Sequence, residues 1–209
     1  IGAPCKPLVA AGDTVRVGQK IGDGDGLCVP VHAPVSGVVA GIEDRPHPGG
    51  GVCPAILIKN DFLDTPEPGV HPCANPEGLT PGELISILRE AGIVGMGGAA
   101  FPTGVKTETG VGATDTLILN ACECEPYITA DDALIRARPG DVLRGLALLA
   151  RALSPERVVI GMEDNKPEAA ALLKGMLKDY PGTELKLLPT RYPQGAEKQL
   201  IQAVTGRQV

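Results

Sequence analysis

The sequence predicts an α/β protein in which a small all-β domain precedes a domain built on a mostly parallel sheet. Short β-branched segments separated by Gly, Pro and Asp fill about the first sixty residues, which is the pattern of a small β unit. After about residue 110, apolar strand-like and helical segments alternate, which is typical of a parallel sheet covered by helices. A chain of 209 residues is long enough for two such domains, each with its own core.

The first domain is predicted over residues 1–64, with strands at 14–17, 27–31, 37–42 and 55–58. Residues 11–21 and 33–39 resemble the barrel-sandwich hybrid of lipoyl and biotinyl domains. Those domains carry their prosthetic group on a Lys in an exposed hairpin, but residues 22–32 contain no Lys. We therefore expect a docking or structural role for this domain.

A linker is predicted over 65–78, in a stretch rich in Pro, Glu and Asp, and the second domain over 79–209. Thr80, Pro81 and Glu83 have the pattern of a capped helix start, so a helix is expected to run to about Ala91 and to end at Gly92.

A βαβαβ alternation is predicted beyond this helix, with strands at 116–119, 157–160 and 184–188 and helices at 141–153 and 167–180. A further helix is expected over 195–204, and Asp131 and Asp132 are expected to begin a short one. Such a Rossmann-like sheet binds ligands beyond the carboxyl ends of its strands, where Asn120 and residues 161–165 fall.

A glycine-rich loop from Gly95 to Lys106 precedes the first of these strands. Glycines leave backbone N–H groups open to a ring or a phosphate, although such a loop can also be a plain connection between elements. Asn120 and Glu123 at the following strand end favour a ligand site.

Composition excludes several classes of function. A net charge of −6 argues against binding of nucleic acid or anionic lipid, and no apolar run is long enough to span a bilayer. The six cysteines lack paired CxxC spacing, so no metal site is predicted. Without a signal peptide they are expected to be reduced thiols of a cytoplasmic protein. The chain begins without Met, and we expect it to be a fragment of a longer polypeptide.

Three segments carry a specific resemblance: GIVGMGGAAFPT at 92–103, NACECEPYIT at 120–129 and YPQGAEKQL at 192–200. With the IGAP opening and the barrel-like first domain, they resemble RnfC, a subunit of the Rnf ion-translocating electron-transport complex. The flavin subunit of respiratory complex I has similar segments.

The resemblance implies an electron-transfer subunit that binds FMN non-covalently and takes NAD(H) as substrate, with hydride passing between nicotinamide and flavin. It passes electrons between NADH and iron-sulfur clusters, which belong to a C-terminal part that lies outside this chain. The implied partners are the other Rnf subunits, which hold the protein at the cytoplasmic face of the membrane without an anchor of its own. Since the chemistry belongs to the cofactor, no catalytic side chain is assigned.

The resemblance also implies which residues bind the cofactor. Glycines of the loop line the flavin with backbone, Lys106 places charge near its polar edge, and Phe101 stacks on the nucleotide or fills the core. Polar side chains of the other two segments contact the ring, the ribityl hydroxyls or the nicotinamide. The full set is Gly95, Gly97, Gly98, Phe101, Lys106, Asn120, Glu123, Glu125, Tyr192, Gly195 and Glu197.

Met96, Cys122 and Ala196 stand where the complex I pattern has Arg, Asp and Glu, which weakens the transfer of its nicotinamide contacts. The family segment that helps to hold the FMN phosphate is expected beyond Val209. Two other interpretations stay open: a non-catalytic docking module with an empty Rossmann-like scaffold, and a related soluble protein such as the proline-reductase-associated electron-transfer protein. Cys122 and Cys124 are expected to be inert, with a redox pair as the alternative.

Overall fold

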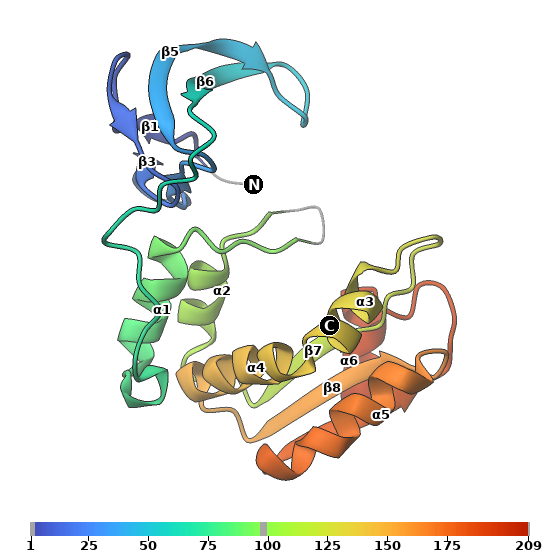
Figure 1. Cartoon of the computed structure of the whole chain (residues 1–209). Helices are drawn as coiled ribbons and strands as arrows, with labels where there is room; N and C mark the ends of the chain where they lie inside the picture. Colours follow the sequence, from blue (N-terminus) through green and yellow to red (C-terminus); the bar gives the residue numbers. More distant parts are fainter. Residues whose placement is uncertain (1–2, 97–99, 209) are drawn as a thin grey trace. The chain divides into compact units, whose positions relative to one another are not determined.

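The computed structural model describes residues 3–96 and 100–208. The chain forms two compact units, Ile1–Glu108 and Thr109–Val209 (Figure 1). The predicted boundaries at 64 and 79 stay a prediction.

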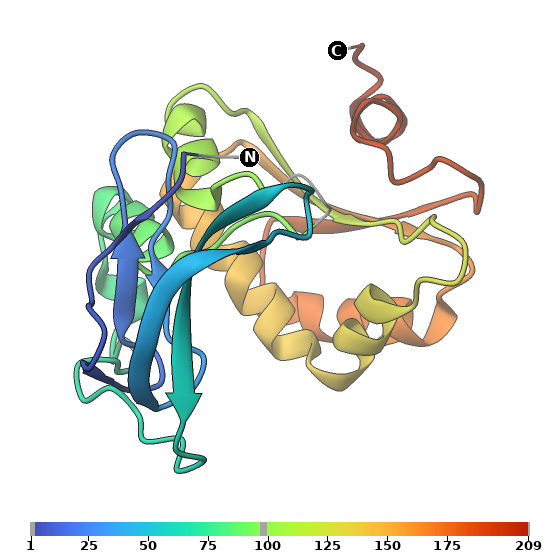
Figure 2. The same cartoon turned by 90° about the horizontal axis from the view of Figure 1, so that it is seen from above.

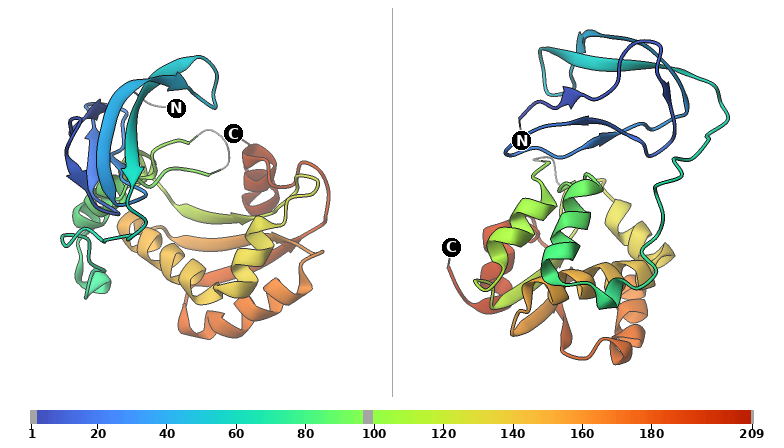
Figure 3. Two further views of the ribbon diagram at one scale, coloured as in Figure 1. Left: turned by 45° about the horizontal axis from the view of Figure 1, so that its top comes forward. Right: turned by 90° about the vertical axis from the view of Figure 1, so that its left-hand side faces the viewer.

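Two small antiparallel sheets form the start of the first unit. One has the order β1-β3-β4, with β1 at Lys6–Pro7, β3 at Lys20–Asp23 and β4 at Val31–His32. The other has the order β2-β5-β6, with β2 at Thr14–Val15, β5 at Gly37–Pro46 and β6 at Val52–Asn60. The long strands β5 and β6 run side by side as a curved ribbon (Figure 3). Buried aliphatic side chains from this region form one hydrophobic core: Val15, Ile21, Ala33 and Val39.

The strand predictions for this unit are only partly correct. Those at 37–42 and 55–58 are confirmed and extended, whereas the one at 27–31 is wrong because the strand begins at Val31. Pro30 has no N–H group to give to a sheet. Strand β3 is not predicted by the sequence pattern, because its Gly and Asp neighbours are typical of a turn, yet Ile21 is buried within it.

The predicted linker is attached to the barrel at its start. The Val17 N–H donates to the Thr65 carbonyl over 2.9 Å, and the Glu67 N–H donates to the Val17 carbonyl over 2.9 Å. A single 3-10 turn, η1 at Pro76–Gly78, precedes the first helix.

Helix α1 at Pro81–Glu90 confirms the predicted capped helix. The Glu83 N–H donates to Thr80 Oγ1 over 3.3 Å, and the Thr80 N–H donates to Glu83 Oε2 over 2.8 Å, which is a complete capping box. Helix α2 at Thr103–Gly110 is not predicted by the sequence pattern. It lies beside α1, since a Cβ on Gly104 would stand 3.4 Å from the Cβ of Arg89 (Figure 3).

The second unit confirms the predicted βαβαβ alternation. Its parallel sheet has the order β7-β8-β9, with β7 at Thr116–Ala121, β8 at Arg157–Glu163 and β9 at Thr183–Leu188. The helices are α3 at Ala130–Ala137, α4 at Pro139–Leu153, α5 at Pro167–Met176 with the 3-10 turn η2 at Leu177–Asp179, and α6 at Glu197–Thr205.

Helices cover both faces of this sheet (Figure 2). Helices α3, α4 and α5 pack on one face, where Leu143, Ile160 and Leu173 are fully buried. Helix α6 packs on the other, where a Cβ on Gly161 would stand 2.8 Å from Leu200 Cδ1. The carboxyl edge of the sheet is left for polar side chains.

Among the described residues, no helix combines the length and the apolar character needed to cross a bilayer.

Candidate functional site

In the first unit, backbone pairing joins the two ends of the glycine loop. The Gly95 N–H donates to the Phe101 carbonyl over 2.8 Å, and Val94 forms an antiparallel bridge with Pro102. Phe101 is 36% exposed, so it does not fill a core, and Met96 is 97% exposed. Predicted site residues Gly97 and Gly98 lie outside the described residues.

The loop is shorter than expected, because α2 begins at Thr103. Lys106 therefore lies on a helix, with its N–H donating to the Pro102 carbonyl over 3.1 Å and its side chain exposed. Its predicted role beside the flavin stays a prediction.

In the second unit, Asn120 joins the acidic turn to the third predicted segment. Its Nδ2 donates to the Gly195 carbonyl over 2.8 Å, and its Oδ1 accepts from the Cys122 N–H over 3.1 Å. The Gly195 N–H in turn donates to Cys124 Sγ over 3.3 Å. Residues 75 positions apart in the sequence are thus brought together at the carboxyl end of β7.

Gly195 is required at this junction. A Cβ there would stand 2.1 Å from the Cys122 carbonyl oxygen, so no other residue fits without moving the backbone. The segment reaches the junction through a cis Tyr192–Pro193 peptide bond.

Glu123 is engaged within the protein. Its side chain is 2% exposed, and its carboxylate accepts the Asp131 N–H over 2.7 Å and the Asp132 N–H over 3.4 Å. Lys166 Nζ approaches the same carboxylate over 3.3 Å. Glu123 thus accepts hydrogen bonds from the N-terminus of α3 and pairs with Lys166, which follows β8. These contacts are typical of a residue that holds the surrounding backbone in place.

The other predicted acidic and aromatic side chains of this edge are exposed enough to meet a ligand. Glu125 and Glu197 are exposed, and Tyr192 is 73% exposed.

Burial, and then the neighbouring Glu123 carboxylate, raise the pKa of the Asp131 carboxyl. Burial, followed by the charges of Glu163 and Cys124, raises the pKa of the Cys122 thiol to about 12. Cys122 therefore stays a neutral thiol at physiological pH.

Three further residues of this edge were not among the predicted site residues: the sequence placed Glu163 at the strand end without giving it a role, and it named neither Lys166 nor Gln194 as a site residue. Lys166 pairs with Glu123, and the buried Glu163 accepts the Arg191 N–H over 3.3 Å. Gln194, 1% exposed, accepts from Arg191 Nε over 2.7 Å, while its Nε2 has no partner within the described ranges. Their positions could have indicated Glu163 and Lys166, because Glu163 ends a strand of the predicted sheet and Lys166 follows that strand.

The first unit has the two small sheets of a barrel-sandwich hybrid, and the second is an α/β domain with a Rossmann-like parallel sheet and polar residues at its carboxyl edge. The chain belongs to the family of the Nuo51 FMN-binding domain, whose family model matches residues 88–209. Residues 1–63 match the RnfC barrel sandwich hybrid domain. Both parts of the predicted fold and the resemblance to RnfC are thereby confirmed.

Curated relatives match along the whole chain. It is 44% identical to the C subunit of the Na(+)-translocating ferredoxin:NAD(+) oxidoreductase complex of Acetobacterium woodii, covering 100% of this chain and 48% of the relative. It is 45% identical to the C subunit of the ion-translocating oxidoreductase complex of Pseudomonas aeruginosa, covering 100% of this chain and 27% of that protein. The chain therefore spans half the length of these relatives or less.

A solved structure of similar fold is an NAD+-reducing [NiFe]-hydrogenase in the air-oxidized state. Its TM-score is 0.56 at 26% identity, over 64% of this chain and 25% of the hydrogenase chain. The same kind of enzyme in the H2-reduced state gives a TM-score of 0.53 at 27% identity, over 61% of this chain and 24% of that one.

Proposed function

We propose that the chain is part of an electron-transfer subunit that binds FMN and NAD(H) and passes electrons between NADH and iron-sulfur centres of an ion-translocating ferredoxin:NAD oxidoreductase. Subunits with such names are the relatives of the whole chain. The observation that carries the proposal is the junction of Asn120, Cys124 and Gly195, which joins two predicted flavin segments in a matched FMN-binding domain.

The residues at this edge fit the polar part of a flavin other than its phosphate. Glu125 and Glu197 are exposed acceptors suited to ribityl hydroxyls and ring N–H groups, and Gln194 Nε2 is a buried donor that lacks a partner among the described residues. Like charges repel a phosphate from these carboxylates. The phosphate is therefore expected to be held by residues other than these carboxylates.

When bound, FMN supplies the exchange of a hydride with nicotinamide and of single electrons with iron-sulfur centres. The protein supplies position. Asn120 and Gly195 hold two segments of the edge together, and Glu123 fixes the start of α3 beside them. On the two sides of the glycine segment, Met96 and Ala100 are exposed, and the exposed Lys106 follows them along the chain.

The partners proposed for the whole protein are the other subunits of the complex, its iron-sulfur centres, and NAD(H). Through these subunits it would sit at the cytoplasmic face of the membrane. Met96, Cys122 and Ala196 differ from the complex I pattern, so nicotinamide contacts in this site are expected to differ as well.

The test is quenching of FMN fluorescence on titration with the purified chain, and with a chain extended past Val209 to the length of its relatives. We expect the extended chain to quench FMN, a Gly97→Val variant to lose quenching, and a Gly175→Val control to keep it. A Cβ on Gly175 meets no described residue within 4 Å. Absence of quenching by both chains would overturn the proposal and favour the docking module.

NAD(H) is tested separately by adding NADH anaerobically to the FMN-loaded extended chain and following the flavin absorbance. Bleaching is the expected result. Quenching without bleaching would leave FMN binding in place but remove NADH as the electron donor.

A further inference from the structure

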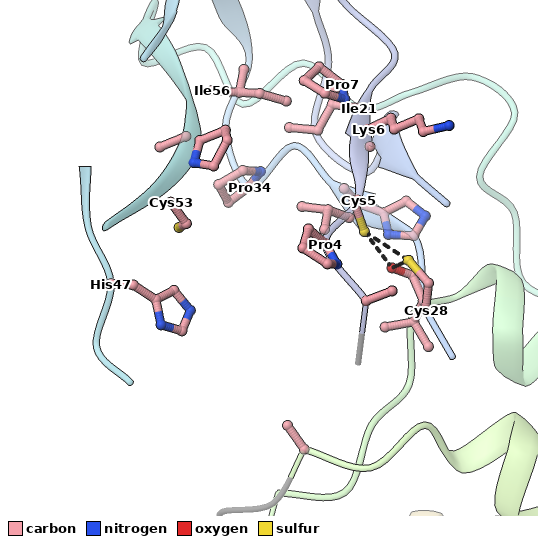
Figure 4. A pocket seen from close by; sticks show the side chains of 18 of the residues that line it. Pro4, Cys5, Lys6, Pro7, Ile21, Cys28, Pro34, His47, Cys53 and Ile56 are labelled. Carbon is pink, nitrogen blue, oxygen red and sulfur yellow. Dashed lines mark hydrogen bonds between the residues drawn. The ribbon is translucent and has the colours of Figure 1, made fainter. Parts of the chain in front are cut away.

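Two cysteine sulfurs meet within the first unit. Cys5, directly before β1, and Cys28, in the turn between β3 and β4, place their Sγ atoms 3.1 Å apart (Figure 4). Both thiols also point at one acceptor, the Val29 carbonyl oxygen, at 3.2 Å from Cys5 Sγ and 3.6 Å from Cys28 Sγ. The shared acceptor turns the two sulfurs toward each other.

The surrounding backbone fixes both partners. Strand β1 pairs antiparallel with β3, and the Ala3 N–H donates to the Leu27 carbonyl over 2.7 Å. The turn is tightly packed, since a Cβ on Gly24 would stand 3.2 Å from Cys28 Sγ and 3.4 Å from the Pro4 carbonyl oxygen. Arg89 of α1 holds the same turn by donating to the Gly24 carbonyl over 3.3 Å. The sulfur contact is therefore set by the fold of the barrel rather than by two flexible side chains.

The pair can be reached from solvent. Cys5 and Cys28 both line an open cavity of about 1070 Å³, together with apolar residues such as Ile21 and Ile56. Cys28 is 4% exposed, whereas Cys5 is half-buried. A small thiol reagent would thus meet Cys5 first, with Cys28 behind it.

We propose that Cys5 and Cys28 form a reversible dithiol/disulfide couple whose oxidant is a low-molecular-weight disulfide such as oxidised glutathione. The Cys5 thiolate attacks one sulfur of the oxidant and releases the first small thiol. The Cys28 thiolate then attacks Cys5 Sγ and releases the second. Two protein thiols and one small disulfide become one protein disulfide and two small thiols, so electrons and protons balance.

The environment of the pair favours the disulfide at equilibrium and slows its formation. Burial, and then the contact with Cys28, raise the pKa of the Cys5 thiol to about 11, so little thiolate exists at neutral pH. A protein whose thiolates are not stabilised has a less oxidising disulfide, which resists reduction once it has formed. The rate of closure should therefore rise with pH, while the closed state should persist in mild reductant.

The chain contains other thiols against which the assignment can be judged. Cys53 lines the same cavity, Cys73 is exposed, and Cys122 and Cys124 belong to the second unit. A bridge between Cys122 and Cys124 would close a strained ring of one intervening residue. Within the part of the chain that the structure describes, Cys5 and Cys28 are the pair whose sulfurs are in contact.

The experiment incubates the native chain with excess oxidised glutathione, blocks the remaining thiols by alkylation, and maps tryptic peptides by mass spectrometry without reduction. Trypsin cuts after Arg16 and Lys20 but not before Pro7 or Pro46. Cys28 and Cys53 therefore share one peptide, and the mapping is done in a Cys53→Ser background. We expect one linked pair of peptides, lighter by two hydrogens, which dithiothreitol separates.

The variants Cys5→Ser and Cys28→Ser should each lose this link completely, whereas Cys73→Ser should keep it. A chain oxidised in concentrated urea should give mixed pairings, which shows that the selectivity comes from the fold. Glutathione adducts on Cys5 without an internal link, or selective linkage of another pair, would overturn the proposal. This result is independent of flavin, so it separates the couple from the proposed function.

Discussion

At Gly195 the backbone of the third segment lies against the acidic turn, and a Cβ would stand 2.1 Å from the Cys122 carbonyl oxygen. We expect Gly195→Ala to lower the free energy of unfolding of the second unit by about 2 to 3 kcal/mol, because the backbone must shift. The Asn120 contact to the Gly195 carbonyl would be lost with it. Urea denaturation measures the change.

Gly145→Ala is the matched control, since Gly145 lies inside α4 and a Cβ there meets no described residue within 4 Å. It should raise the stability by about 0.5 to 1 kcal/mol through helix propensity. Equal effects of the two substitutions would show that the close approach at Gly195 does not limit the fold.

Cys122 gives the second unit a pH dependence. Its thiol has a pKa raised from 9.0 to about 12 in the folded state, first by burial and then by Glu163 and Cys124. Because the folded pKa exceeds the unfolded one, the stabilisation is complete below pH 9.0 and is lost as pH rises toward 12. Between these values the wild type should lose up to about 1.4 kcal/mol per pH unit more than Cys122→Ala. Parallel pH profiles of the two proteins would contradict the assignment.

Among the elements, α3 depends on a side chain from the turn that precedes it. Its own N-cap residue, Thr129, makes no side-chain cap to the described backbone, and Glu123 accepts the N–H groups of Asp131 and Asp132 instead. In Glu123→Gln, the loss of charge should leave Lys166 without its ion-pair partner and weaken the helix start. We expect a loss of about 1 to 3 kcal/mol and faster amide hydrogen exchange in the first turn of α3.

Glu125→Gln provides the comparison, because Glu125 is exposed and should change stability by less than about 0.5 kcal/mol. If Glu123→Gln instead leaves exchange in α3 unchanged and only weakens FMN binding, Glu123 contacts the ligand rather than the helix.

Elements with strong local signals were predictable, and those fixed by tertiary contacts were not. The capping box of Thr80 and Glu83 is a local signal, contained in four residues, that predicts the start of α1. Helix α2 has the sequence TGVKTETG, whose Thr and Gly residues are poor helix formers, and its position depends on Gly104 packing against Arg89. Strand β3 similarly forms because β1 and β4 pair with it on either side.

Across the whole molecule, the site residues also divide into those that local sequence predicts and those that tertiary contacts place. The order of strands along the sequence predicts that Asn120 and Glu163 lie at one edge of the sheet. It does not predict that the Glu123 side chain turns inward, since its contact with Lys166 joins residues 43 positions apart. The resemblance to a family supplied the list of candidate residues, and the structure separates the engaged Glu123 from the exposed Glu125 and Glu197.

All three tyrosines of the chain, Tyr127, Tyr180 and Tyr192, belong to the second unit, whereas Phe62 and Phe101 belong to the first. Tyrosine fluorescence during urea denaturation therefore reports on Thr109–Val209 alone, and circular dichroism reports on both units. In this chain, FMN at about one hundred times its dissociation constant should stabilise the tyrosine transition by about 2.7 kcal/mol, if Asn120, Glu125 and Glu197 contact it. Riboflavin, which lacks the phosphate, is the comparison ligand. A tyrosine transition indifferent to FMN, alongside quenched flavin, would place the bound flavin away from the carboxyl edge of β7 and β8.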